Sequence, residues 1–449
     1  MEYRNRLKVA FHTLGCKVNQ YESEALKEQF IAYGDEIVDE DSIADVYIVN
    51  TCTVTGIADR KSRQYIKKMK RKNPDSLMVV TGCYAQVASY KISKIEEVDM
   101  IIGNSLKSTI CDKVHEETAL RQEERSKFVH VLGYSELNYY EDMGVLAHTH
   151  SDRCRAYIKI QEGCNRFCSY CMIPFARGIV RSRPYEEIIE EARSLVLIGV
   201  KEIILTGINT ALYGFDFHNT GNYPLSDLIK EINEIEGDFR IRLSSLEPTV
   251  VKTDDVKSLI GYEKLCHHLH LSAQSGNANI LKRMNRTYDR DEYLKIVKAL
   301  KEFDPLYGIT TDIIVGFPGE TEADFDESIS LIENAGFCRV HAFKYSPRNG
   351  TKAAAFEDKV PAEVKNERIT KLVQKAAEVS RDFIAKNRGV YHRVLTEERT
   401  AGFVTGYTDN YIRVYMPDDA ASIEIDEFYE VELKELYKDG CLAVPKVLE

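Results

Sequence analysis

The sequence lacks a long hydrophobic run. None of its apolar stretches approaches the ~20 residues that an α-helix needs to cross a bilayer. It also lacks an N-terminal targeting segment, since Met-Glu-Tyr-Arg-Asn-Arg is neither a secretory signal nor a transit peptide. We therefore expect a cytoplasmic protein without membrane spans, whose 11 cysteines stay reduced and do not form a disulfide framework.

The sequence lacks an excess of positive charge as well. Its 60 Lys and Arg residues are outnumbered by 71 Asp and Glu residues, which gives a formal net charge of -11. This balance argues against a surface that is basic throughout, but it permits a local basic patch. One basic run spans residues 60–72, and it is either a surface that follows a phosphate backbone or the solvated face of a helix. The candidate RNA-binding residues in this run are Arg60, Lys61, Arg63 and Lys67.

What the sequence does contain is a dense cysteine motif, C-x3-C-x2-C, formed by Cys164, Cys168 and Cys171. Spacings this short let one loop fold three thiolates around a single inorganic centre. A structural zinc ion takes four ligands, whereas a 4Fe-4S cluster held by three cysteines keeps one iron open for a small molecule. The spacing favours the cluster, and zinc is the alternative. Three upstream side chains would supply a fourth zinc ligand: His148, His150 and Cys154.

The N-terminal part alternates short apolar runs with helical stretches, which predicts a parallel sheet wound with helices. The expected strands are residues 8–13, 46–49, 77–80 and 100–102. Each of the first three is followed by a cysteine, in turn Cys16, Cys52 and Cys83. Because the carboxyl ends of parallel strands share one edge of a sheet, we expect these cysteines to converge. They are the predicted ligands of a second 4Fe-4S cluster, again with an open iron.

From residue 155 the pattern changes to strand, loop and helix, repeated. Six units of this kind describe a partial (β/α)6 barrel, whose ligands bind in the loops that follow the strands. The expected strands are residues 157–161, 202–206, 240–244, 268–272, 309–315 and 339–345, with amphipathic helices such as 185–198 and 322–335 between them. The loops offer glycines, hydroxyls, amides and a carboxylate to a polar ligand. The candidate ligand-binding residues are Thr206, Gly207, Asn209, Ser245, Glu247, Gln274, Gly316 and Phe317.

The C-terminal part begins with a long charged helix at about residues 362–387. Five short strands follow and predict a small β-barrel, a form often used on RNA; they are residues 390–395, 402–407, 412–414, 429–433 and 442–447. Because this tail is acidic, its RNA contacts would depend on Tyr407, Tyr411, Arg413 and Tyr415. The remaining cysteines have no ligand spacing and are predicted to be structural: Cys111, Cys154, Cys266, Cys338 and Cys441. The predicted domains span residues 1–150, 151–360 and 389–449, with a linker helix at 361–388.

Together these regions resemble the radical S-adenosylmethionine (SAM) methylthiotransferases. The resemblance is carried by Thr-Leu-Gly-Cys-Lys-Val-Asn-Gln-Tyr-Glu-Ser-Glu at residues 13–24, by Gly-Cys-Asn-Arg-Phe-Cys-Ser-Tyr-Cys at residues 163–171, and by the C-terminal barrel, which resembles a TRAM domain. Residues 16–19 and 406–411 look most like the branch that methylthiolates C2 of N6-threonylcarbamoyladenosine at tRNA position 37, next to the anticodon. Two other branches act on isopentenyladenosine in tRNA and on an aspartate of a ribosomal protein.

The resemblance also implies cofactors and partners. The cluster at the C-x3-C-x2-C motif would bind SAM and deliver the electron that releases a 5'-deoxyadenosyl radical. The second cluster would hold the sulfur that is transferred. A second SAM molecule would methylate this sulfur, so that two SAM molecules are used per turnover. The implied partners are a tRNA substrate and a one-electron donor such as flavodoxin or ferredoxin, and the implied state is a monomer. Asn209 and Ala211 stand where the family often has His and Gly. Two non-catalytic alternatives remain, an iron-sulfur electron carrier and an RNA-binding scaffold.

Overall fold

The computed structural model describes residues 6–53, 56–120, 126–144, 154–217, 224–248, 253–418 and 423–446. His148 and His150, the predicted zinc alternatives, lie outside these residues, as does the predicted domain boundary at residue 150. The chain divides into two compact units. The first comprises Met1–Thr149, Lys159–Phe167 and Cys171–Glu187, and the second comprises His150–Ile158, Cys168–Tyr170 and Ile188–Glu449. None of the described helices is long and apolar enough to cross a membrane.

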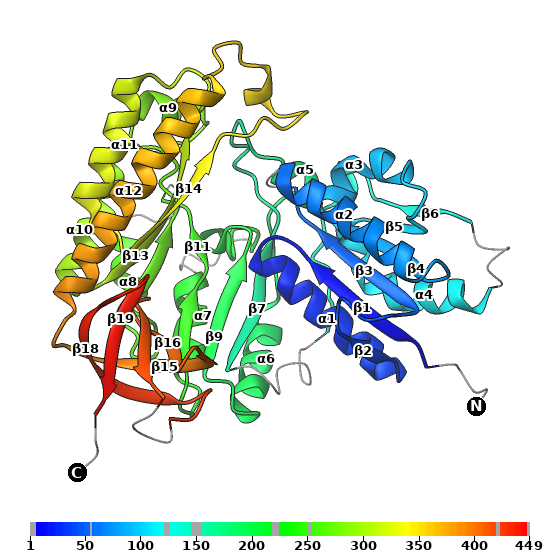
Figure 1. Ribbon diagram of the computed structural model, residues 1–449, viewed down its shortest axis with the longest axis horizontal. Helices are drawn as coiled ribbons and strands as arrows, with labels where there is room; N and C mark the ends of the chain where they lie inside the picture. The colour runs from blue at the N-terminus through cyan, green and yellow to red at the C-terminus, as the bar shows by residue number, and fades with distance from the viewer. Residues whose placement is uncertain are drawn as a thin grey trace. The chain divides into compact units, whose positions relative to one another are not determined.

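A six-stranded parallel sheet, blue to cyan in Figure 1, is the base of the first unit. Its strands are β1 (Lys8–Thr13), β2 (Glu36–Val38), β3 (Val46–Thr51), β4 (Leu77–Gly82), β5 (Met100–Ile102) and β6 (Phe128–His130), in the order β2-β1-β3-β4-β5-β6. The four predicted strands are confirmed. β3 and β4 are buried along their whole length, as expected of parallel strands covered on both faces. The sequence did not reveal β2 and β6, because their side chains are only partly buried or exposed and the strands therefore lack an apolar run; β5 is equally short, but it is buried throughout and was predicted.

Helices cover both faces of this sheet. They are α1 (Lys17–Tyr33), α2 (Gly56–Lys72), α3 (Cys83–Ser93) and α4 (Ile110–Ala119). On one face, Tyr65 of α2 and Tyr84 of α3 join a hydrophobic cluster that includes Ala10 of β1. The neighbouring residue Phe11 points to the opposite face, since side chains alternate along a strand, and there it meets Phe30 of α1. The sheet is therefore the middle of three layers.

A partial (β/α) barrel supplies the next strands. They are β7 (Arg155–Glu162), β8 (Arg181–Ser182), β9 (Glu202–Gly207), β10 (Arg240–Leu243), β11 (Ser245–Leu246), β12 (His268–Leu271), β13 (Gly308–Val315) and β14 (Arg339–Lys344), in two sheets with the orders β10-β9-β7-β8 and β11-β12-β13-β14. All six predicted strands are confirmed, and the third is divided into β10 and β11. The helices are α5 (Ile173–Arg177), α6 (Tyr185–Leu197), α7 (Pro224–Asn233), α8 (Thr253–Leu259), α9 (Ala278–Arg283), α10 (Arg290–Phe303) and α11 (Glu322–Ala335). Capping boxes begin α10 at Asp289 and α11 at Thr321.

A long helix and a closed β-barrel complete the second unit. The helix is α12 (Ala362–Lys386), and the barrel contains β15 (Tyr391–Thr400), β16 (Phe403–Thr408), β17 (Arg413–Pro417), β18 (Phe428–Tyr437) and β19 (Gly440–Pro445) in the order β15-β16-β17-β19-β18. The five predicted strands and the small barrel are confirmed. Inward-facing side chains such as Val394, Val414 and Leu433 are fully buried and form its core.

A buried ionic network around Glu202 joins this barrel to strands β9 and β10. The carboxylate of Glu202 is fully buried and contacts Arg155 at 3.0 Å, Arg240 at 2.5 Å and Arg242 at 3.1 Å. Burial alone would raise the pKa of Glu202, but the three guanidinium groups hold it well below its usual value. Arg155 also pairs with Glu397 of the barrel at 2.6 Å. Arg240 and Arg242 donate to backbone carbonyls of residues 407–409, so the turn between β16 and β17 is fixed against the sheet.

Candidate functional site

The three N-terminal cysteines lie at the carboxyl edge of the first sheet. Cys16 is the N-cap residue of α1 directly after β1, Cys52 follows β3, and Cys83 is the first residue of α3 after β4. The strand order β2-β1-β3 places a topological switch point between β1 and β3, and open α/β sheets bind their ligands at such points. The structure therefore brings these cysteines to adjacent strand ends, as the sequence predicted.

Two glycines let the cysteine loops approach one another. Gly15 has a φ of 110°, and a Cβ built on it would lie 2.7 Å from Cβ of Cys52 and 2.9 Å from its Sγ. Gly82 has a φ of 94°, and a Cβ there would collide with the carbonyl oxygen of Thr51. Both backbone conformations favour glycine, and both positions leave no space for a side chain. Each glycine directly precedes a cysteine, so it sets the direction in which Cys16 or Cys83 leaves its strand.

The chemistry of these three side chains fits an iron-sulfur cluster. All are free thiols; Cys52 and Cys83 are buried and Cys16 is exposed. Cys16 and Cys83 stand at the N-termini of α1 and α3, where the helix dipole favours thiolates and the anionic cluster that they bind. Three thiolates with one accessible side are the donor set of a 4Fe-4S cluster that keeps one iron open.

The C-x3-C-x2-C motif occupies the loop between β7 and α5, as expected. Its three thiols are partly exposed. The backbone N–H of Cys164 donates to the carbonyl of Gly178 at 3.1 Å, and the N–H of Ile173 donates to Sγ of Cys171 at 3.4 Å. An amide that points at the sulfur favours its thiolate form, which is the form that binds iron.

Arg286 connects the predicted SAM residue Glu247 with Tyr170 of the motif. Nη1 of Arg286 lies 2.5 Å from Oε1 of Glu247, and Nη2 donates to the Tyr170 hydroxyl at 3.1 Å. The second oxygen of Glu247 accepts from Nδ2 of Asn209 at 2.9 Å. Arg286 therefore neutralises a carboxylate and fixes its position beside the motif.

Four other predicted SAM residues lie at strand ends of the same unit. Thr206 is buried at the end of β9, with its hydroxyl 3.4 Å from that of Ser244. Gly207 and Ser245 are partly exposed. Gln274 has a φ of 65°, uncommon for a residue with a side chain, and its N–H donates to the carbonyl of Asp312 at 2.8 Å. These positions offer two hydroxyls and an amide beside the loop that carries Glu247.

Gly316 and Phe317 have structural partners. The N–H of Gly316 donates to Oε1 of Glu320 at 2.8 Å. Phe317 is fully buried in a hydrophobic cluster and packs edge-on against Tyr170, with ring centroids 6.2 Å apart. Its ring therefore supports the motif loop by packing.

The predicted RNA-binding residues of residues 60–72 lie on one face of α2. Arg60, Lys61, Arg63 and Lys67 are exposed, whereas Ser62, Tyr65, Ile66 and Met69 face the sheet and are buried. Arg63 also donates to the Tyr84 hydroxyl at 3.2 Å. The outer face of this helix is therefore solvated and carries a row of cations.

The predicted RNA residues of the closed barrel are engaged within the protein. Tyr411 stacks on His268 at 4.4 Å and on Tyr407 at 5.2 Å between ring centroids. Arg413 pairs with Glu398 at 3.0 Å. Tyr411 thus anchors the turn between β16 and β17 by stacking on two neighbouring rings.

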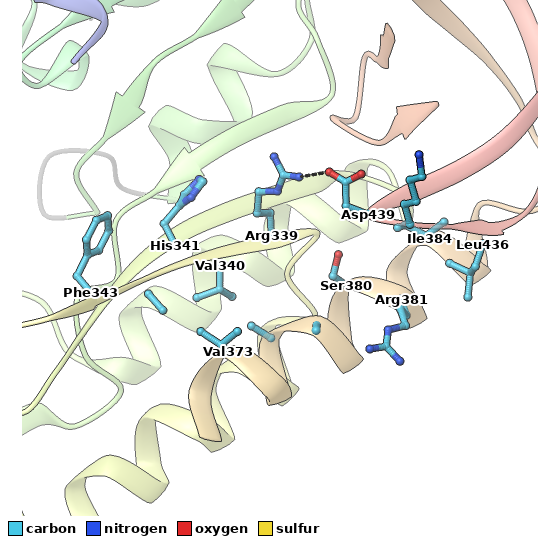
Figure 2. A pocket seen from close by; sticks show the side chains of 14 residues that line it. Arg339, Val340, His341, Phe343, Val373, Ser380, Arg381, Ile384, Leu436 and Asp439 are labelled. Carbon is cyan, nitrogen blue, oxygen red and sulfur yellow. Dashed lines mark hydrogen bonds and ion pairs between the residues drawn. The ribbon is translucent and has the colours of Figure 1, made fainter. Parts of the chain in front are cut away.

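A groove of about 530 Å³ lies between β14, α12 and the turn that joins β18 to β19 (Figure 2). Figure 2 shows Val340 pointing from β14 toward α12, while Arg339 and His341 point to the other side of the strand. Apolar side chains of β14 and α12 line the groove. Cations stand at one end of it: Arg339, Arg381 and Lys438, with Asp439 as an acidic neighbour.

Comparison with known proteins agrees with this organisation. Residues 158–332 match the Radical SAM superfamily, and residues 8–103 match the Uncharacterized protein family UPF0004. The chain is 41% identical over 412 residues to the threonylcarbamoyladenosine tRNA methylthiotransferase MtaB of Bacillus subtilis (strain 168), covering 90% of this chain and 89% of that protein. It is 37% identical over 394 residues to a tRNA-2-methylthio-N(6)-dimethylallyladenosine synthase of Clostridium botulinum (strain Hall), covering 86% of this chain and 85% of that protein.

A solved structure of the radical SAM methyltransferase TsrM from Kitasatospora setae, with cobalamin and a 4Fe-4S cluster bound, has a TM-score of 0.57 to this chain. The match covers 78% of this chain and 77% of that one at 13% identity, which shows a shared fold alone. Membership of the superfamily implies a 4Fe-4S cluster and SAM as cofactors. The sequence matches along nearly the whole chain decide the closer relationship. The chain belongs to the family of threonylcarbamoyladenosine tRNA methylthiotransferases within the radical SAM superfamily.

Proposed function

We propose that this chain adds a methylthio group to C2 of N6-threonylcarbamoyladenosine at tRNA position 37. The observation that carries the proposal is the arrangement of Cys16, Cys52 and Cys83 at three adjacent strand ends, in a chain that also has the C-x3-C-x2-C loop. An iron-sulfur electron carrier needs no second site of this kind with an accessible side. The substrate is supported by the Bacillus subtilis relative, which is a threonylcarbamoyladenosine tRNA methylthiotransferase.

The proposed ligands of the SAM-binding cluster are Cys164, Cys168 and Cys171, and those of the second cluster are Cys16, Cys52 and Cys83. When bound, the clusters supply the electron that cleaves SAM and the sulfur that is transferred, with two SAM molecules used per turnover. The protein binds and orients the ligands. Asn209 and Arg286 hold the carboxylate of Glu247 in one position, from which it can accept hydrogen bonds from ribose hydroxyls.

The exposed cations of α2 are the proposed contact for the tRNA backbone. In the described part of the chain, Arg60, Lys61 and Lys67 have no carboxylate within ion-pair distance, so their charge is available to phosphates. The neighbouring Lys68 pairs with Asp41 at 2.6 Å and is partly neutralised. A tRNA substrate places the activity in the cytoplasm, where a flavodoxin or ferredoxin would be the one-electron donor and the enzyme would act as a monomer.

The test is mass spectrometry of tRNA nucleosides from cells that lack the gene and carry it back on a plasmid. We expect 2-methylthio-N6-threonylcarbamoyladenosine to disappear on deletion and to return with the wild-type gene. Two triple-alanine variants, one for each set of cysteines, should each fail to restore it and should each lose about four of about eight irons per chain after anaerobic reconstitution. Cys111→Ala is the control, since this buried cysteine belongs to neither set.

Each contrary outcome identifies another function. Loss of the methylthio mark on isopentenyladenosine alone would assign the other tRNA branch. Bound clusters without 5'-deoxyadenosine formation from SAM and a reductant would indicate an electron carrier. Restoration of the mark by both triple-alanine variants would leave an RNA-binding scaffold.

A further inference from the structure

Arg177 contacts one of the second-cluster cysteines from inside the first unit. Its guanidinium group is fully buried, and Nε donates to Sγ of Cys83 at 3.2 Å. The two residues are 94 positions apart in the chain. Cys83 itself is the first residue of α3, so its sulfur already lies in the positive field of a helix N-terminus.

The other N–H groups of Arg177 hold the guanidinium in one orientation. Nη1 donates to Glu22 at 2.7 Å and to Glu162 at 2.6 Å, and Nη2 donates to Asn19 at 2.6 Å and to Glu22 at 3.0 Å. Together with the bond from Nε, these interactions employ all five N–H donors that a guanidinium has. The orientation of Nε toward the sulfur is therefore determined by rigid partners on α1 and at the end of β7.

Positive charge exceeds negative charge around this sulfur. Four cations in the region are buried: Lys107, Lys159, Arg177 and Arg181. The described carboxylates in ion-pair contact with them are Glu22 and Glu162. The nearby Glu141 is a poor third partner, because burial raises its pKa to about 7. Buried charges need partners of opposite sign, and thiolates with their anionic cluster would provide one.

We propose that Arg177 is a positioning residue for the second iron-sulfur cluster, holding the Cys83 thiolate by a charge-assisted hydrogen bond and stabilising the reduced cluster. The inference depends on the proposed function, since it requires a cluster at Cys16, Cys52 and Cys83. Hydrogen bonds to cluster sulfurs and nearby positive charge raise the reduction potential, so removing this group lowers it. Arg181 is the matched comparison: it is also buried and lies 3.6 Å from Glu162, but it makes no bond to Cys83.

The experiment uses the full chain with alanine at Cys164, Cys168 and Cys171, which leaves the second cluster alone, and with 15N-labelled arginine. Pulsed electron–nuclear double resonance of the reduced cluster should show a coupling to arginine 15N that disappears in Arg177→Lys and persists in Arg181→Lys. The midpoint potential of the cluster should be lower in Arg177→Gln than in the parent, and shifted less in Arg181→Gln. A cluster with about four irons and no 15N coupling would overturn the role of Arg177 alone. A parent chain that binds no iron would overturn the second cluster as well.

An independent observation concerns exposed aromatic side chains of the same unit. Phe167, Phe175 and Tyr134 are 43%, 42% and 44% exposed, respectively. The ring of Phe175 lies 6.1 Å from that of Phe167 and 6.3 Å from that of Tyr134, so the three form one patch. Phe167 lies inside the C-x3-C-x2-C loop and has a φ of 48°, a strained conformation for a bulky residue.

We propose that this aromatic patch stacks on unpaired nucleobases of the tRNA anticodon loop. Single-stranded loops are recognised by stacking their bases on exposed aromatic rings. Because Phe167 of the patch belongs to the cluster loop, the patch would meet the bases beside the one that is modified. This inference deepens the proposed function by naming a surface for its substrate. The four exposed cations of α2, Arg60, Lys61, Arg63 and Lys67, belong to the same unit and complement the phosphates of such a loop.

The test measures the affinity of the reconstituted enzyme for an anticodon stem-loop RNA of about 17 nucleotides. Removing one stacking ring is expected to weaken this affinity by roughly 5- to 100-fold. Phe167→Leu and Phe175→Leu should each raise the dissociation constant by that factor. SAM cleavage without RNA should stay unchanged in Phe175→Leu, because Phe175 belongs to α5 and not to the cluster loop. Phe303→Leu, which alters a ring that is 46% exposed elsewhere, should change neither. Unchanged RNA binding in both variants would overturn the proposal that this patch binds RNA. Variants that change the oligomeric state and leave the RNA affinity unchanged would overturn it as well. Affinity that depends on these rings without methylthiolated product would overturn the proposed function alone.

Discussion

Glu202 gives the sharpest prediction about stability, because this single buried carboxylate pairs with three arginines, of which Arg240 and Arg242 are buried. We expect Glu202→Gln to unfold the second unit at a markedly lower temperature. Glutamine preserves the shape of the side chain and one of its oxygens, so the variant removes charge and leaves packing nearly unchanged. Arg240 and Arg242 would then remain buried without their shared partner, while the partly exposed Arg155 would keep its pair with Glu397.

The magnitude follows from the distances. Each guanidinium nitrogen lies within 3.1 Å of the carboxylate, which corresponds to charge centres roughly 4 Å apart and about 4 kcal/mol of attraction per pair at an effective dielectric constant of about 20. Desolvation opposes most of this attraction in the folded state. Removing one partner of a buried ion pair typically costs about 3–5 kcal/mol. For a unit of this size that loss lowers the melting temperature by roughly 6–20 °C.

Thermal unfolding followed by far-UV circular dichroism measures the effect, since the chain has no tryptophan to report by fluorescence. Glu302→Gln is the control: its partner Lys298 lies 3.7 Å away and both side chains are more than half exposed, so little change is expected. A Glu202→Gln variant that melts within about 2 °C of the wild type would refute the argument that this network holds the barrel to the sheet.

Three further predictions follow from buried or constrained groups. Burial raises the pKa of Glu141 to about 7, above its value of about 4.3 in the unfolded chain. The stability that the protonated Glu141 carboxyl contributes is therefore complete below pH ~4 and is lost as the pH rises through 7. Melting temperatures should accordingly fall between pH 5 and 8 by more in the wild type than in Glu141→Gln. Arg286→Lys cannot reproduce the fork that holds Glu247, and SAM binding by equilibrium dialysis should weaken by about tenfold, whereas unchanged affinity would remove Arg286 from the site. Gly82→Ala should lose about half of the reconstituted iron because its Cβ collides with the neighbouring strand, while Gly34→Ala, with a similar φ of 93° but open space around it, should keep its iron.

The fold could be predicted from the sequence wherever burial leaves a continuous pattern. Runs such as residues 46–49 and 77–80 are apolar throughout because parallel strands are covered on both faces, and each is found as a strand. The placement of Cys16, Cys52 and Cys83 at one edge of the sheet could be predicted from the same pattern, since parallel strands end on one side of a sheet. Residues 60–72 were ambiguous for a physical reason: a helix with one buried face shows the same charges whether or not RNA binds to the other.

The polar contacts of the site could not be predicted, because they join residues that are far apart and show no periodicity. Arg177 and Glu22 are 155 positions apart, and Glu22 sits on a helix where a charged residue suggests solvent exposure. The partners of Tyr411 could not be predicted either. An aromatic residue in an RNA-binding type of barrel suggests a stacking surface, and in the structure its ring stacks on His268 and Tyr407.

The placement of Cys16, Cys52 and Cys83 on three separate strands has a consequence for the biogenesis of the protein. The cysteines of residues 164–171 are close together in the sequence, so that segment would be able to bind metal while the chain is still being synthesised. The other three thiols meet only after β1, β3 and β4 have paired, which requires contacts between residues well separated in sequence. If these thiols hold the proposed second cluster, the first sheet would have to pair before that cluster is inserted. Delayed or defective folding of this sheet would then leave the proposed second site without metal.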